Sequence, residues 1–356
     1  MNRLDREKVN RIAVRLPNWL GDAVMATPAL QVLHHLFPNA SFTILVRENL
    51  AELFASCPFA EEVIPLTRVS GTRKIPQLFD AASKLKKKEF DLAVCFPHSF
   101  SSAWMLWLAG IPQRVGFSAE GRRMFLTRSL PYPFDGERPH RVRFYCQLVE
   151  LVAAQKLAVL PLQVWPRPLN KEEAGALEKK VDGFQNLATV APGSVGPAKR
   201  WFADRYAKMV KKLIGERNVR VVLVGAAHDH PSCEEVARLS GASPVNLAGE
   251  TSLSELCFLF QKSRLFLGND SGAGHLAAAA GIPVIILTGA GDPDEIAPWT
   301  DKKTVLFKKI FCSPCYRPTC RRKDHPLECM DLIGADEVWR AVESWLAKSE
   351  KPVAAP

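Results

Sequence analysis

Arg11-Ile-Ala-Val-Arg-Leu16 is followed by Pro17-Asn-Trp-Leu-Gly-Asp22, and this succession sets the expectation for the whole architecture. The first segment is short and apolar, as a buried strand is, and the second is rich in turn residues. Apolar residues then recur at helical spacing from Ala23 to Phe37, before Pro38 ends the pattern. A strand, a loop and a helix in this order predict the start of a βαβ unit in a parallel sheet.

The same alternation continues along the chain and restarts after its middle. Further strands are expected at 41–46, 62–66, 91–96, 186–191, 219–225, 245–247, 264–268 and 282–287, with helices between them, including 23–37, 48–56, 75–89, 171–181 and 204–214. A proline-rich linker at 163–170 separates the two halves. We therefore expect an α/β protein with domains at 1–165 and 166–356 that face each other across a cleft, the last helix being free to pack back on the first domain. Ligands would bind at the carboxyl ends of the strands.

Composition narrows the class of protein. Hydrophobic residues make up 47% of the chain and charged residues 24%, which excludes a wholly disordered chain. No apolar run reaches the roughly 20 residues of a membrane helix, and the charged N-terminus lacks a secretory apolar core, so we expect a cytoplasmic protein. Neither G-x-G-x-x-G nor a P-loop motif is present, which disfavours nicotinamide dehydrogenases and P-loop NTPases.

The charge of the chain is positive and uneven. The net charge is +10, and residues 1–160 hold 21 Lys and Arg against 14 Asp and Glu. Such asymmetry suggests an anionic partner, which could be a nucleic acid, a phosphorylated substrate or a membrane surface. A solvated surface with extra lysines is the alternative.

Two strand-end loops of the first half carry polar side chains. Asp22 ends a Gly-containing loop where a helix starts, so it is either the helix N-cap or a general base. Pro97-His98-Ser99-Phe-Ser-Ser102 follows the strand expected at 91–96. Its polar side chains could grip a hydroxylated acceptor.

Two strand-end loops of the second half are suited to phosphate. Ala191-Pro-Gly-Ser-Val-Gly-Pro-Ala-Lys-Arg-Trp201 offers backbone N–H groups and the cations Lys199 and Arg200. A structural turn with solvated cations is the alternative for this loop. Gly268-Asn-Asp-Ser-Gly-Ala-Gly-His275 also joins a strand to a helix, whose first amides can hold an anion, and His275 falls in the first turn of that helix.

Five segments, in the same order along the chain, carry a family resemblance. They are Pro17-Asn-Trp-Leu-Gly-Asp22, Phe96-Pro-His-Ser-Phe-Ser-Ser102, Gly196-Pro-Ala-Lys-Arg-Trp201, Asn246-Leu-Ala-Gly-Glu-Thr251 and Asn269-Asp-Ser-Gly-Ala-Gly-His275. The chain resembles the bacterial ADP-heptose:lipopolysaccharide heptosyltransferases of glycosyltransferase family 9, most closely those of type II. The resemblance implies a GT-B fold of two Rossmann-like domains. It also implies inverting transfer of L-glycero-D-manno-heptose from ADP-heptose to the heptosyl-Kdo2-lipid A inner core.

Other functions on this architecture stay open at this point. They are another GT-B sugar transferase, a nucleotide-sugar epimerase, or a non-catalytic protein that binds a nucleotide sugar or lipid A. The resemblance further implies that no cofactor or metal is required and that nucleic acid is not a partner. The partners would be ADP-heptose and the Kdo-lipid A acceptor, and the protein would work as a peripheral protein at the cytoplasmic face of the inner membrane.

The resemblance also assigns roles to individual residues. Asp22 would be the base, with His98 as second choice, and Lys199 and Ser194 would bind the donor diphosphate. Four further residues would line the donor site: Asp270, Ser271, Gly272 and His275. Asp229 would reach a ribose hydroxyl. Position and charge, rather than the resemblance, supply the acceptor-binding candidates His98, Ser99, Arg122 and Arg123. The last two belong to an arginine-rich segment, 122–143, which could pair with acceptor carboxylates or phosphates or could simply be a soluble surface.

Two further patterns suggest metals. Cys312-x2-Cys315-x4-Cys320-x8-Cys329 could form a structural zinc site, although reduced thiols or a redox-labile disulfide are alternatives. Asp292-Pro-Asp294 has the D-x-D form of metal-dependent sugar transferases. It follows a Gly-rich turn, where aspartate is common for turn chemistry alone, and we therefore expect no metal there.

Overall fold

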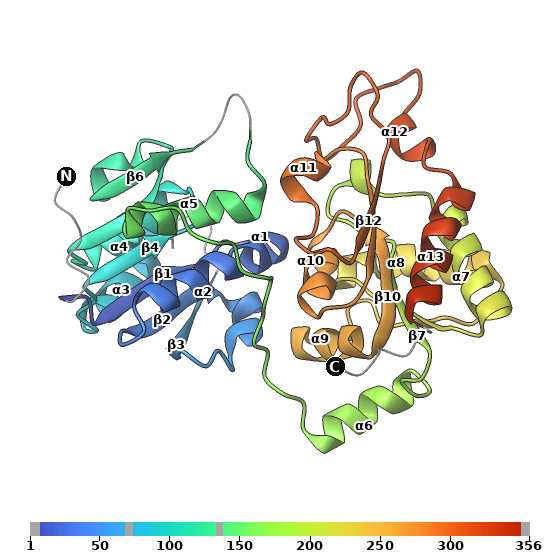
Figure 1. Ribbon diagram of the computed structural model, residues 1–356, viewed down its shortest axis with the longest axis horizontal. Helices are drawn as coiled ribbons and strands as arrows, with labels where there is room; N and C mark the ends of the chain where they lie inside the picture. Colours follow the sequence, from blue (N-terminus) through green and yellow to red (C-terminus); the bar gives the residue numbers. More distant parts are fainter. Residues whose placement is uncertain (1–7, 68–73, 133–137, 350–356) are drawn as a thin grey trace. The chain divides into compact units, whose positions relative to one another are not determined.

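The computed structural model describes residues 8–67, 74–132 and 138–349. The chain divides into two compact units, Met1–Arg167 and Pro168–Pro356, called here the N-terminal and C-terminal units. The division falls two residues beyond the boundary expected from the sequence. Each unit has its own parallel six-stranded sheet with helices, which confirms the predicted α/β class of two Rossmann-like domains (Figure 1).

The sheet of the N-terminal unit has the strand order β3-β2-β1-β4-β5-β6. Its strands are β1 (Arg11–Arg15), β2 (Ser41–Arg47), β3 (Ala60–Leu66), β4 (Leu92–Cys95), β5 (Gln113–Ser118) and β6 (Arg128–Pro131). The central strand β1 is buried and pairs in parallel with β2 on one side and β4 on the other. The strand order therefore reverses at β1 and β4, and ligands of open α/β sheets bind at the carboxyl ends of such strands.

Helices cover this sheet, and one of them departs from expectation. They are α1 (Leu20–Met25), α2 (Thr27–Leu36), α3 (Lys74–Lys86), α4 (Phe100–Leu108) and α5 (Arg141–Ala153), with the 3₁₀ helices η2 (Glu48–Phe54) and η4 (Arg122–Phe125). The single helix expected from Ala23 to Phe37 is two helices, divided at Ala26. Pro28 has no N–H to continue the α1 hydrogen-bond ladder, so α2 starts anew with this proline in its first turn.

The sheet of the C-terminal unit has the order β12-β11-β10-β7-β8-β9, the same topology in chain order as the first sheet. Its strands are β7 (Leu187–Ala191), β8 (Arg220–Leu223), β9 (Val245–Asn246), β10 (Ser263–Asn269), β11 (Val284–Thr288) and β12 (Lys303–Phe307). β10 and β7 are central and neighbouring, and both are almost entirely buried. The loops after these two strands are the two phosphate-binding candidates.

Helices and short turns complete the C-terminal unit. They are α6 (Lys171–Lys180), η5 (Pro197–Lys199), α7 (Ala203–Arg217), η6 (Ala227–Asp229), α8 (His230–Ser240), α9 (Leu253–Lys262), α10 (Gly272–Ala279), α11 (Pro293–Ile296), α12 (Glu328–Asp331) and α13 (Ala335–Ser349). The last helix, α13, contacts α7, β10 and β11 and buries Val338, Trp339, Val342 and Leu346 in the core of this unit. Its apolar face is therefore occupied by its own unit. No helix in the described part of the chain is long and apolar enough to cross a membrane.

Candidate active site

The carboxylate of Asp22 is held at the carboxyl end of β1 by residues of α5. Asp22 lies in the first turn of α1, whose N-cap is Trp19, so the alternative reading of Asp22 as the N-cap is wrong. Its Oδ1 accepts a hydrogen bond of 3.0 Å from the Tyr145 hydroxyl and lies 3.9 Å from Arg141 Nε. The side chain keeps 30% of its surface exposed. An oriented and accessible carboxylate can accept a proton from a bound hydroxyl group.

His98 follows β4, the strand that pairs with β1, and its side chain is exposed. Its ring contacts the ring of Tyr132, with 4.4 Å between the ring centroids. Loss of water around the imidazole lowers the pKa of His98, and nearby Arg122 and Arg141 lower it further, while Glu120 and Asp22 oppose the shift. The imidazole is therefore neutral at neutral pH. A neutral imidazole can accept or donate a hydrogen bond to a sugar hydroxyl.

Arg122 is not a surface residue, which corrects its expected contact with the acceptor. The side chain is wholly buried and donates hydrogen bonds to Pro97 O (2.6 Å), Ser99 O (2.8 Å) and Phe117 O (2.8 Å), and to Ser102 Oγ (3.0 Å). It fixes the loop after β4, and with it the position of the partly exposed Ser99. The charge of Arg122 predicted an exposed side chain. In the structure the backbone carbonyl groups of this loop need a hydrogen-bond donor, and the buried guanidinium is that donor.

Arg123, the neighbouring candidate, is exposed. Its Nη1 donates a hydrogen bond of 3.4 Å to Ser129 Oγ. The four acceptor candidates therefore divide into three accessible residues, His98, Ser99 and Arg123, and one buried residue that supports their loop.

In the C-terminal unit, the cation and the carboxylate expected at the donor site meet directly. Lys199 of η5 and Asp270, which follows β10, form an ion pair of 2.6 Å. The Asp270 side chain is 8% exposed and that of Lys199 33%, so the pair lies at the surface end of the strands with its cation facing outward. A diphosphate placed here would meet a preformed positive charge.

The loop after β7 is held by its own cation. Arg200 donates hydrogen bonds of 2.9 and 2.8 Å from Nε and Nη2 to Ser194 O. Ser194 is buried and Lys199 follows within the same loop. Gly193 lies so close to the Asp229 carboxyl that a Cβ at this position would overlap it. These contacts bring the expected donor residues Ser194, Lys199 and Asp229 to one edge of the sheet.

Asp229 is buried, and one of its two carboxylate oxygens accepts a hydrogen bond from the described residues. Its Oδ2 accepts a hydrogen bond of 3.1 Å from Ala226 N. Its Oδ1 accepts no hydrogen bond in the described part of the chain, although His228 Nε2 lies 3.5 Å away. An unmatched carboxylate oxygen beside a phosphate loop is suited to a hydroxyl donor such as a ribose.

Three residues expected at the donor site lie at the start of α10. Ser271 and Gly272 begin the helix, and His275 is buried in its first turn. Ser271 is the N-cap and Gly272 opens the helix, so the first amides of α10 follow directly after Asp270. His275 is only 4% exposed, so little of its imidazole is accessible to a donor. Its role at the donor site stays a prediction, for a side chain that is about as buried as those of Ser194 and Asp270.

Asn269 ties the two candidate donor loops together, and it was not among the site residues predicted from the sequence. Its Oδ1 accepts hydrogen bonds from Trp201 N (3.0 Å) and Tyr206 Oη (2.9 Å), and its Nδ2 donates to Pro192 O (2.8 Å). An asparagine directly before Asp-Ser-Gly at the end of a buried strand was the available signal. Its partners, 63 to 77 residues away, were not predictable from local pattern.

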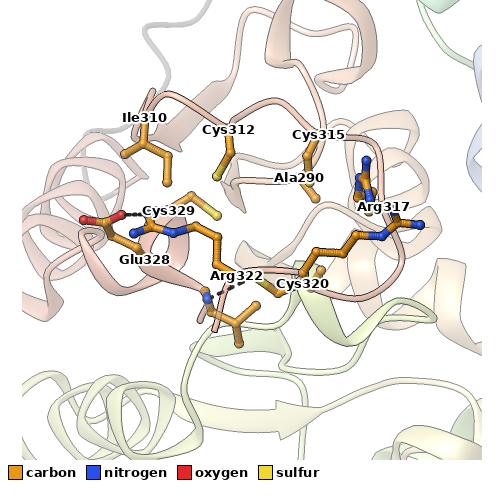
Figure 2. Close-up of a pocket in the computed structure, with 12 residues that line it drawn as sticks. Ala290, Ile310, Cys312, Cys315, Arg317, Cys320, Arg322, Glu328 and Cys329 are labelled. Atoms are coloured by element: carbon orange, nitrogen blue, oxygen red, sulfur yellow. Dashed lines mark hydrogen bonds and ion pairs between the residues drawn. The ribbon is translucent and has the colours of Figure 1, made fainter. Parts of the chain in front are cut away.

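The four C-terminal cysteines line one cavity of about 490 Å³, together with Arg317, Arg322 and Glu328 (Figure 2). All four are free thiols. Across residues 8–67, 74–132 and 138–349, no three His, Cys, Asp or Glu side chains form a group that could hold a metal ion. A zinc site, one of the three possibilities raised by this spacing, is therefore not formed by the described residues: Cys329 packs in the hydrophobic core, and Cys320 Sγ accepts a hydrogen bond from Leu327 N.

The D-x-D pattern caps a helix. Asp292 is the N-cap of α11, and its Oδ1 accepts a hydrogen bond of 3.0 Å from Asp294 N. This is the turn chemistry expected of these aspartates.

Comparison with known proteins places the chain in a family. Residues 79–325 match the family model of glycosyltransferase family 9 (heptosyltransferase). Lipopolysaccharide heptosyltransferase 2 of Salmonella typhimurium is 31% identical over 307 residues, which cover 83% of this chain and 87% of that protein. The Escherichia coli protein of the same name is 32% identical over 313 residues, with the same coverage.

Solved structures agree with the sequence comparisons. The structure of E. coli ADP-heptose lps heptosyltransferase II superposes with a TM-score of 0.79 at 25% identity and covers 96% of this chain and 100% of that chain. This match confirms the GT-B fold that the resemblance implied. The chain belongs to glycosyltransferase family 9, the heptosyltransferases.

Proposed function

We propose that this protein transfers L-glycero-D-manno-heptose from ADP-heptose to the heptosyl-Kdo2-lipid A inner core of lipopolysaccharide. The observation that carries the proposal is the similarity, over most of the chain, to proteins named lipopolysaccharide heptosyltransferase 2. Both halves of the required chemistry have candidate residues in the structure. The N-terminal unit, as the acceptor domain, offers a carboxylate, and the C-terminal unit, as the donor domain, offers a diphosphate site.

The donor diphosphate would bind at the ends of β7 and β10. Lys199 would bind its negative charge, with Ser194 and the first amides of α10 as further donors, and Asp229 would accept a ribose hydroxyl. As the bond from the anomeric carbon to the diphosphate breaks, negative charge grows on the leaving ADP. A fixed ammonium group stabilises that charge without a metal ion.

The transfer itself would use Asp22 as the base. An acceptor hydroxyl attacks the anomeric carbon from the side opposite the diphosphate, which inverts the configuration there. Asp22 takes the hydroxyl proton as the new C–O bond forms, and ADP departs. Tyr145 and Arg141 hold Oδ1 of the carboxylate, and Oδ2 accepts no hydrogen bond in the described part of the chain.

The acceptor would bind to His98, Ser99 and Arg123 of the N-terminal unit. The acceptor is anionic and anchored in lipid, which fits the excess of positive charge in residues 1–160. The protein would thus act in the cytoplasm, as a peripheral protein at the inner membrane.

Mass spectrometry of the reaction product tests the proposal. The protein is incubated with ADP-heptose and a series of truncated core acceptors, and addition of one heptose to heptosyl-Kdo2-lipid A is expected. Heptose addition to Kdo2-lipid A instead would reassign the acceptor, and transfer only from another nucleotide sugar would reassign the donor. Binding of ADP-heptose without any product would show a non-catalytic binding protein.

A further inference from the structure

A buried cation without an acidic partner lies at the centre of the N-terminal sheet. Arg15 is the last residue of β1 and is only 6% exposed. Its guanidinium donates hydrogen bonds to Leu16 O, to Leu45 O and to Asn18 Oδ1. No carboxylate of the described residues forms an ion pair with it, and its Nε is buried without a hydrogen-bond partner there.

The environment of Arg15 opposes its charge. Burial, together with the nearby Arg47, lowers the pKa of Arg15 to about 10, while Cys95 opposes the shift. The group is still charged at neutral pH, so the protein holds a positive charge in a poorly solvated place. Such a charge is costly unless an anion compensates it.

Arg15 borders a cavity of about 490 Å³, the Arg15 cavity. Its other polar lining residues include Asn18, Gln77, Ser99 and Ser101. The one carboxylate among the described lining residues, Asp80, pairs with Lys84 at 2.7 Å, and both side chains are largely exposed. The cavity therefore offers a buried guanidinium, hydroxyls and amides, the groups that bind an oxyanion and its neighbouring hydroxyls.

The position of the Arg15 cavity also favours a ligand. It lies where β1 and β4 end, at the strands where the sheet order reverses. A second buried guanidinium, that of Arg122, bonds the Ser99–Ser102 turn beside it and likewise has no ion pair with a described carboxylate. Two uncompensated cations at one sheet edge attract anions more strongly than one.

We infer that the Arg15 cavity is a binding site for an oxyanion, a carboxylate or a phosphate, carried by a hydroxylated sugar ligand. Arg15 would bind the oxyanion, and Asn18 and Ser101 would bind hydroxyls next to it. The site itself rests on the geometry around Arg15. Only the identity of its ligand, an anionic sugar of the acceptor, rests on the proposed function.

Calorimetric titration of the full-length protein with single sugars tests this site. The probes are Kdo, which carries a carboxylate, its neutral methyl ester, and glucosamine phosphate. At least one anion is expected to bind while the ester does not, and which anion binds tells a sugar acid from a sugar phosphate. Arg15→Met should weaken the binding by about tenfold or more, the share of hydrogen bonds to a charged group. Arg11→Met, a matched change at the exposed opposite end of β1, should leave it unchanged.

Folding of the variant serves as an independent readout. Loss of an uncompensated buried charge should not lower the melting temperature of Arg15→Met. If that variant does not fold, Arg15→Lys keeps the charge but loses the planar fork, and anion binding should weaken severalfold in it. Equal binding of ester and anions by the wild type, or wild-type anion affinity in the folded Arg15 variant, would overturn the inference.

The titrations separate this site from the proposed function. They involve no turnover, so the anion result stands even if heptose transfer fails. Heptose transfer could in turn be found while Arg15→Met binds anions normally, which would reject only the Arg15 site. ADP affinity should be the same in all the variants, because the donor residues lie in the other unit.

Discussion

The carboxylate of Asp22 depends on a partner from far along the chain. The Tyr145 hydroxyl, 123 residues away, donates to Oδ1, and the other oxygen accepts no hydrogen bond from the described residues. A base on a side chain whose rotamer is fixed in this way loses little entropy when it meets the hydroxyl. Because Oδ1 of Asp22 is engaged in this hydrogen bond, replacing the carboxylate by another group of the same size should change the activity.

Replacement of Asp22 by Asn should lower kcat by about 10²- to 10⁴-fold, the usual share of general-base catalysis. The amide keeps the size of the side chain but cannot take the proton. Steady-state kinetics with ADP-heptose and acceptor measure the change, and ADP binding should be nearly intact. Near-normal turnover in Asp22→Asn, together with inactivity of His98→Ala, would transfer the role of base to His98.

Lys199 carries the second prediction at this scale. Lys199→Ala should lower kcat/KM by about 10²-fold or more, because one preorganised charge on the leaving diphosphate is lost. Lys308→Ala, which breaks a pair of 2.8 Å with Glu337 away from the site, is the matched control and should have no effect. Activity should also survive EDTA. A strict requirement for added Mg²⁺ that disappears with Asp292→Asn would contradict the metal-free reading.

At the scale of elements, the end of β10 holds the donor site together. Asn269 joins the loop after β7, the start of α7 and its own strand through three buried hydrogen bonds. The ion pair of Lys199 and Asp270 lies directly beside it. The Asn269 amide and this ion pair therefore both hold the two loops in their relative position.

Asn269→Ala should lower the free energy of unfolding by about 2–4 kcal/mol, because it leaves buried donors and acceptors unsatisfied. Denaturant unfolding followed by circular dichroism measures the loss, and ADP affinity should fall as well. Asn246→Ala, at the end of the partly exposed β9, should cost much less. An equal loss of unfolding free energy in the two variants would show that the hydrogen bonds of Asn269 stabilise the protein no more than those of Asn246.

The C-terminal segment allows a prediction about thiol reactivity. Burial, and the nearby thiols of Cys315 and Cys312, raise the pKa of Cys329, whereas Cys312, Cys315 and Cys320 are partly exposed. Alkylation of the native protein at neutral pH should therefore modify these three before Cys329. Peptide mass spectrometry resolves the order, and unfolded protein should react at all nine cysteines. Protection of all four until a chelator is added would instead show a bound metal.

Local pattern predicted the buried, apolar strands well and the more polar strands poorly. The apolar runs around β1, β2 and β4 were placed to within about a residue, because strands buried on both faces read as continuous apolar sequence. Three strands were missed because they mix polar and apolar residues: β5, β6 and β12. The contact between Asp22 and Tyr145 could not be predicted from local sequence, because only the completed sheet brings α1 close to α5.

The proposed binding and catalytic roles fall on different units of the molecule, and the two units have the same strand order. Every residue proposed to bind the donor lies in the C-terminal unit, and the proposed base and acceptor residues lie in the N-terminal unit. The structure brings the predicted donor residues Lys199 and Asp270 into contact, whereas it buries Arg122, one of the predicted acceptor residues. Phosphate loops have local signatures, whereas the burial of Arg122 follows from packing alone.

Hydrogen exchange of the full-length protein should show this division. ADP is expected to slow amide exchange in the loops at 193–200 and 269–275, which would form hydrogen bonds to the nucleotide. The loop at 97–102 should change little with ADP alone. Protection by ADP confined to the N-terminal unit would reverse the assignment of donor and acceptor domains.

The all-parallel pairing has a consequence for how the chain is made. Neighbouring parallel strands require long crossovers, so β10 must find β7 across more than seventy residues, and such topologies fold slowly. Each sheet, however, draws all its strands from one contiguous segment, and the first is complete by Pro131. Synthesis of the chain beyond Arg167 takes about 10 to 40 s at the usual rates of translation. The N-terminal unit thus has time to fold on the ribosome before the strands of the second sheet are all present to compete with it.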